Sequence, residues 1–236
     1  MEARELPINP ELEQRERTQK LKEKNKYFTK LKAFILIAAT LIVCAGGGYY
    51  ISDQYLWSSQ DQDRIEEQLD YYKSLVDADS NNPEHRVNLG YTYFVKGDND
   101  EAIKQLKMAT DLDKKYFGAY FNLGLVYIDE ERFNDAIKQA QKAVELGPRN
   151  YKAHLLLGMV YRELEMYKEA NESLREALTL NKTNTDIITE IGKVEEDQGN
   201  FKEAEKYFKE AINYDPLYKP ASEGLERIAA ADRDDK

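Results

Sequence analysis

Small and apolar residues recur along the middle of the chain at a constant interval of 34 positions. The recurring positions are Gly90, Gly124, Gly158 and Gly192, then Ala102, Ala136, Ala170 and Ala204, and then Ala109, Ala143, Ala177 and Ala211. Within one period the apolar residues take helical spacing twice. Tyr120, Leu123 and Tyr127 share one helix face, and Phe133 and Ala140 belong to a second stripe after a short polar break. This period predicts a stacked array of helix pairs rather than a single globular core.

The repeated glycine stands in the middle of the first helix of each pair. Glycine costs about 1 kcal/mol relative to alanine inside a helix, so its return at one register implies a benefit elsewhere. We expect that benefit to be close approach of the two helices of a pair, with alanine on the second helix. Leucine at Gly124 or Ala136 is therefore predicted to overpack the pair and to cost about 1–3 kcal/mol.

The residues of the second period resemble the signature of the tetratricopeptide repeat family, and the period also matches. The resemblance is carried by Tyr120, Leu123, Gly124, Tyr127, Ala136, Ala143 and Pro148, and it covers four copies: 83–116, 117–150, 151–184 and 185–218. It implies an all-α fold, a right-handed superhelical solenoid of antiparallel helix pairs. Arg86, in place of a large aromatic residue, and Glu195, in the tyrosine position, depart from the pattern. Both lie in the end copies, where atypical capping units are expected.

Segments on both sides of the array predict flanking helices. In the connecting segment 52–82, Ile65, Leu69, Tyr72 and Val76 follow helical spacing, which predicts an unpaired second helix that covers the first copy. Residues 219–236 carry a closing helix and a short polar tail, with the helix expected near Leu225.

The segment 33–51 contains 19 residues without a charge. As a helix it approaches the ~30 Å hydrocarbon thickness of a bilayer, which predicts a transmembrane anchor. Basic residues crowd at the end of the polar tail 1–32, whereas Asp53 and Asp61 follow the span. The positive-inside rule then places the tail, which is expected to be disordered, in the cytoplasm and the repeats outside it.

Other interpretations of 33–51 remain open. A signal peptide cleaved after Ala45, a lipoprotein signal with Cys44 as the modified residue, and a buried helix of a soluble protein are the alternatives. Thr40, Cys44 and Gly48 are spaced by four, a small-residue pattern compatible with a homodimer seam in the membrane.

Composition narrows the function classes. The chain has a net charge of −10, a single cysteine and two histidines. His85 and His154 have no neighbouring acid pair or cysteine, and no phosphate-binding glycine loop is present, so we expect no enzyme, metal or cofactor. The residues after 32 carry 25 basic and 38 acidic side chains, a balance that disfavours nucleic acid.

In the tetratricopeptide family, the stripe beside the packing stripe of each first helix lines a concave groove that binds peptides. Here this stripe is apolar in three copies, and two asparagines beside it are possible partners for a bound backbone. The resulting groove residues are Val87, Asn88, Tyr91, Phe94, Phe121, Asn122, Leu125, Ile128, Leu155 and Met159. The fourth copy turns polar at Thr189, Lys193 and Glu196. Val87 and Tyr91 replace the polar pair that clamps chaperone tails in some family members, so we do not expect that mode of binding.

The sequence thus predicts a single-pass membrane protein with a cytoplasmic N-terminus and an extracytoplasmic repeat scaffold. It would bind an apolar segment of a partner protein and aid the assembly, secretion or maturation of an envelope complex. The alternatives are a permanent structural subunit of a membrane complex and an organelle import receptor.

Overall fold

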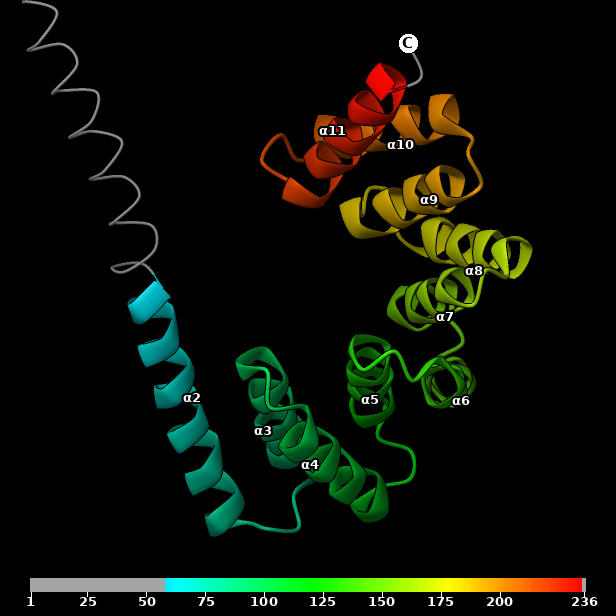
Figure 1. Ribbon diagram of the computed structural model, residues 1–236. Coiled ribbons are helices and arrows are strands. Elements are labelled where there is room, and N and C mark those ends of the chain that lie inside the picture. The colour runs from blue at the N-terminus through cyan, green and yellow to red at the C-terminus, as the bar shows by residue number, and fades with distance from the viewer. Residues whose placement is uncertain (1–57, 235–236) are drawn as a thin grey trace, which may run out of the picture. The chain divides into compact units, whose positions relative to one another are not determined.

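The computed structural model describes residues 58–234, and these residues form ten helices (Figure 1). In chain order they are α2 (Ser58–Ala78), α3 (Pro83–Lys96), α4 (Asn99–Leu112), α5 (Phe117–Asp129), α6 (Phe133–Leu146), α7 (Tyr151–Glu163), α8 (Tyr167–Leu180), α9 (Thr185–Asp197), α10 (Phe201–Tyr214) and α11 (Lys219–Asp234). The predicted tail 1–32, the span 33–51 and the small-residue seam lie outside the described residues. No helix within 58–234 is both long enough and apolar enough to cross a membrane.

Helices α3 to α10 form four antiparallel pairs, and the first helix of each pair begins at the predicted residue: Pro83, Phe117, Tyr151 or Thr185. Each second helix also packs against the first helix of the next pair. The first helices α3, α5, α7 and α9 contact one another in sequence, and α11 continues this layer. The predicted all-α repeat solenoid is therefore confirmed, with first helices in one layer and second helices in the other.

Local sequence sets the helix boundaries. Helices α3, α7 and α9 each follow an asparagine that caps them, as where Asn82 Oδ1 accepts the backbone N–H of Glu84 at 2.9 Å. Helix α3 ends at Gly97, whose φ of 86° is the left-handed conformation that glycine tolerates best. One and two periods later, Glu131 and Glu165 hold the same conformation at φ of 57° and 58°. The repeat thus imposes the left-handed conformation at this turn even where the residue is not a glycine.

The repeated glycines do allow close packing, but not always with the expected partner. A Cβ added to Gly90 would lie 2.8 Å from Leu106 Cγ on α4, the other helix of the same pair, as predicted. A Cβ on Gly124 would instead lie 2.6 Å from Leu156 Cδ2 on α7. Helix α6 carries the short Ala140 at the register of Leu106, so the fully buried Leu156 of the next repeat fills this space. The predicted contact of Gly124 within its own pair is corrected accordingly.

Helices α2 and α11 pack against the two ends of the repeat array. On α2, Leu69 and Val76 form a buried cluster with Leu89 of α3, and Lys96 Nζ lies 2.6 Å from Glu66 Oε1 beside it. At the opposite end, α11 packs on the buried Phe208 of α10. The two helices therefore cover apolar surface that the first and last pairs expose.

Arg86 departs from the repeat pattern but is part of the core. Its side chain is buried, its Nε donates to the carbonyl oxygen of Ser80 at 2.9 Å, and its Nη1 donates to Gln105 Oε1 at 3.0 Å. A buried guanidinium is tolerated because its donors are satisfied. In the first repeat, Arg86 thus joins the α2–α3 connection to α4.

Candidate partner-binding face

Residues at three registers of the first helices form rows across α3, α5, α7 and α9, because these helices pack side by side in chain order. We call this set the first-helix face. Its members are Val87, Phe121, Leu155 and Thr189, then Tyr91, Leu125, Met159 and Lys193, and then Phe94, Ile128, Arg162 and Glu196. The nine members on α3, α5 and α7 are apolar except Arg162, whereas all three on α9 are polar.

The apolar part of this face is mostly half-buried. Tyr91 is 47% exposed, while Val87 and Leu155 are buried; the other predicted groove residues, Asn88, Phe94, Phe121, Asn122, Leu125, Ile128 and Met159, are intermediate. The half-buried apolar side chains on α3 and α5 also pack against the core cluster of the first repeats. Contact between neighbouring first helices accounts for this burial. The face is therefore a shallow apolar lining with one prominent ring rather than a row of fully exposed side chains.

Aromatic rings give this lining a defined surface. The rings of Phe117 and Phe121 stack at a centroid distance of 5.9 Å, and those of Tyr91 and Phe94 lie 6.4 Å apart in a tilted arrangement. Aromatic pairs of this geometry stabilise each other and limit rotamer freedom. The tyrosine adds a hydroxyl group to an otherwise apolar surface.

The two asparagines beside the apolar rows retain their hydrogen-bonding capacity. Besides the helix hydrogen bonds of its backbone, Asn88 accepts a hydrogen bond at its carbonyl oxygen from the Thr92 hydroxyl at 2.9 Å. Within residues 58–234, neither the Asn88 nor the Asn122 side chain has a hydrogen bond to another group. An amide carries two donors and an acceptor, so these half-buried groups are suited to pairing with the backbone of a bound segment.

The α9 end of the face is organised by Arg162. Its Nε lies 3.2 Å from Glu190 Oε2 and its Nη1 lies 3.0 Å from Asp197 Oδ2, while its Nη2 pairs with Glu163. Lys193 Nζ approaches the other oxygen of Glu190 at 2.6 Å. Glu190 is buried, and such a carboxylate is tolerated because two cations compensate it.

The neighbouring carboxylates favour the charged form of Arg162. Burial alone lowers the pKa of Arg162, but the carboxylates of Glu190, Asp197 and Glu163 more than offset that effect and raise it. Arg162 was not among the groove residues predicted from the sequence. Its place 34 positions after Ile128 was the signal that would have identified it.

The histidines have structural partners. A ring nitrogen of His85, Nδ1, lies 3.2 Å from the carbonyl oxygen of Leu75, and Nε2 of His154 lies 2.9 Å from the carbonyl oxygen of Pro148. Each ring nitrogen donates to its carbonyl, since a carbonyl oxygen only accepts. In the part of the chain that the structure describes, no three histidine, cysteine or acidic side chains gather in a way that would hold a metal.

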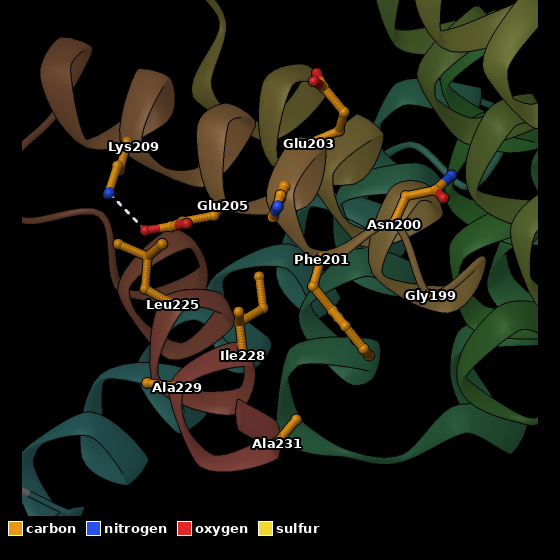
Figure 2. Close-up of a pocket in the computed structure, with 11 residues that line it drawn as sticks. Gly199, Asn200, Phe201, Glu203, Glu205, Lys209, Leu225, Ile228, Ala229 and Ala231 are labelled. Atoms are coloured by element: carbon orange, nitrogen blue, oxygen red, sulfur yellow. Dashed lines mark hydrogen bonds and ion pairs between the residues drawn. The ribbon is translucent and has the colours of Figure 1, made fainter. Parts of the chain in front are cut away.

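A separate pocket of about 930 Å³ lies between α10 and α11 (Figure 2). Phe201 and Lys209 line it from α10, and Leu225 and Ile228 from α11. A Cβ added to Gly224 of α11 would lie 2.6 Å from Phe208 Cε2 of α10, so this helix packs closely on the last helix of the fourth pair. This agrees with a closing helix at the end of the array.

Comparisons with known proteins support the repeat architecture. Family profiles described as TPR repeat and tetratricopeptide repeat match residues 90–130, 121–185 and 185–216. A crystal structure of MamA is 28% identical at a TM-score of 0.55, covering 67% of this chain and 93% of MamA. TTC0263 of Thermus thermophilus, a thermophilic TPR protein, is 22% identical at a TM-score of 0.64, covering 74% of this chain and 93% of TTC0263.

YrrB, described as a TPR protein with an unusual peptide-binding site, is 23% identical at a TM-score of 0.53, and the similarity covers 75% of this chain and 90% of YrrB. At this identity YrrB and TTC0263 show the fold alone. No curated protein matches this chain in sequence.

Proposed function

This chain is built of tetratricopeptide repeats over residues 90–216, and we propose that it is a scaffold that binds a segment of a partner protein on its first-helix face. The observation that carries the proposal is the continuity of the apolar rows across three successive helices, beside two amides with unused donors and acceptors. An extended or helical segment gains affinity from such a lining and orientation from such amides. A peptide-binding site in the similar protein YrrB is consistent with this use of the fold.

Substitutions on the face separate binding from stability. Tyr91→Asp is the preferred variant because Tyr91 is the most exposed member of the apolar rows, so a charge there spares the core. Phe121→Asp and Leu125→Asp will also weaken capture, but both side chains pack on the core cluster and their loss lowers stability as well. Leu180→Asp, at an exposed position that ends the second helix α8, is the matched control.

The test is site-specific photocrosslinking of the full chain in the cells that produce it. A photoreactive residue at Phe121 should yield a discrete protein adduct, and the same residue at Leu180 should not. Tyr91→Asp should abolish the Phe121 adduct while leaving the far-ultraviolet circular dichroism melt within a few degrees of the parent. Equal adducts from both positions, or a Phe121 adduct that survives Tyr91→Asp, would contradict binding on this face.

We further propose that residues 33–51 anchor the scaffold in a membrane, with the basic tail in the cytoplasm and the repeats on the extracytoplasmic side. The uncharged length of this segment and the asymmetry of charge around it support the proposal. An uncleaved chain should remain in the membrane pellet after alkaline extraction, and its repeats should be digested by protease added outside the sealed cytoplasmic membrane. A chain that is released by alkali, or whose mass lacks the first 45 residues, would contradict the anchor.

In this location the scaffold would hold partner proteins during assembly, secretion or maturation of an envelope complex. Salt-labile, substoichiometric partners after gentle solubilisation would fit such a transient role. Recovery at fixed stoichiometry in one complex would instead identify a permanent structural subunit.

A further inference from the structure

Charge is distributed unevenly over the layer of first helices. Helices α3, α5 and α7 carry net charges of +1, −1 and +1, whereas α9 has five acidic residues and one lysine and a net charge of −4. Two of the three apolar rows end at the same helix, where Thr189 and Lys193 replace the apolar side chains, and the third row ends one helix earlier, at Arg162. The layer therefore has a nearly neutral apolar part and an acidic end.

Local ion pairs do not neutralise the acidic end. In addition to the Arg162 network, Glu196 accepts two bonds of 2.8 Å from Arg227 of α11, and Asp186 accepts the hydroxyl of Tyr218. The charged groups that these contacts join are the carboxylates Glu163, Asp186, Glu190, Glu196 and Asp197 and the cations Arg162, Lys193 and Arg227. Five carboxylates against three cations leave a net charge of −2. Asp197 is exposed at the edge of this cluster, where it is accessible to a bound cation.

We infer that the partner segment is apolar along most of its length and basic at one end, and that its basic end lies over α9. The inference rests on the proposed binding function and specifies the chemistry of the partner. Apolar side chains of the segment would cover the rows of α3, α5 and α7, and lysine or arginine at its end would compensate the excess carboxylates. An acidic end would add repulsion at the same place.

The size of the face sets the length of the segment. Packed helices have axes up to about 10 Å apart, so the four first helices span about 30 Å. An extended chain rises about 3.3 Å per residue, so about nine residues cross the layer. The basic end is placed at the N-terminus in one probe and at the C-terminus in another, so that both chain directions are tested.

Three kinds of synthetic peptide test the inference against the full chain in nanodiscs of zwitterionic lipid, with empty discs as the blank. Each is about nine residues long, with the same apolar core of about seven residues and an end of two lysines, two glutamates or two serines. Binding is measured by fluorescence anisotropy at about 0.05 M and about 0.5 M salt, because exposed charges are screened at the higher concentration. A benzophenone group beside the charged end then reports which helix it contacts.

We expect one of the lysine-ended peptides to bind about tenfold more tightly than the glutamate-ended peptide of the same direction at low salt, with the difference shrinking at high salt. Its benzophenone should label α9. If the serine-ended peptide binds and is weakened by Tyr91→Asp but the lysine-ended peptide has no advantage, the inference is overturned and the binding function stands. If none of the peptides binds, both are contradicted.

A charge-reversal variant tests whether the acidic end of the face causes the preference for the lysine-ended peptide. Asp197→Lys should abolish the preference for the lysine-ended peptide over the serine-ended one. Glu172→Lys makes the same change on an exposed position of the second helix α8 and should leave the preference within about twofold of the parent. An equal loss in both variants would show that overall charge, rather than the acidic end of the face, attracts the peptide.

Discussion

The contact of Gly124 with Leu156 gives a quantitative test of how one repeat locks into the next. A Cβ at Gly124 would lie 2.6 Å from Leu156 Cδ2 and 3.2 Å from its Cδ1, so even one added carbon is too close. Leucine at Gly124 adds four. We take the overpacking cost at the upper end of about 1–3 kcal/mol and subtract about 0.8 kcal/mol for the better helix propensity, which leaves a loss of about 2 kcal/mol.

Removing the obstructing side chain should recover much of this loss. Leu156 is fully buried, so Leu156→Ala alone is expected to cost about 3 kcal/mol. In the double variant, the new leucine at Gly124 fills the cavity that Leu156 leaves. The double variant should therefore cost about 1–2 kcal/mol less than the sum of the two single losses.

The assay is urea denaturation of the full chain in nonionic detergent, followed by circular dichroism at the helical band. Leu174→Ala is the matched control, because Leu174 is equally buried but obstructs Gly158, whose added Cβ would lie 2.5 Å from Leu174 Cγ. Gly124→Leu and Leu174→Ala should add within about 0.5 kcal/mol. Additive losses for Gly124 and Leu156 as well would refute the packing described for this interface.

Three further outcomes follow from single sites. Glu131→Gly relieves a left-handed backbone and should stabilise the chain by about 0.5–1 kcal/mol in the same denaturation assay, whereas Gly97→Glu should destabilise it. Arg162→Ala leaves the buried Glu190 with Lys193 as its single cation and should lower the free energy of unfolding by about 2–3 kcal/mol in the same denaturation assay. Burial and then the hydrogen bond to the Asp186 carboxylate raise the pKa of Tyr218 above its unfolded value of about 10. The contribution of Tyr218 to the free energy of unfolding is therefore fully present below about pH 10 and is lost as the pH rises further. Tyr218→Phe should therefore be less stable than the parent at neutral pH and lose less stability above pH 10; parallel alkaline losses in the two proteins would contradict this.

The sequence was sufficient to identify the positions that form the candidate face, but not the exposure of their side chains. The spacing of Val87, Phe121 and Leu155 was sufficient to place them on successive first helices. Their burial depends on how closely those helices approach, and this is set by contacts between residues more than thirty positions apart. The ion pair of Arg162 with Glu190 could not be predicted either, because nothing in the local sequence indicates which side chains of two different repeats will pair.

What the sequence determined by itself is what depends on local spacing: the 34-residue period and the helix pairs with their first residues. A helix face is defined within a few turns, so its apolar stripe can be read along the chain. Only the tertiary structure decided which neighbouring side chain packs against each of these small residues. Gly124 and Gly90 occupy the same register, yet Gly124 faces the next repeat because Ala140 leaves room there for Leu156. Close packing is a property of all the side chains that meet at one point in space, and these come from separate repeats.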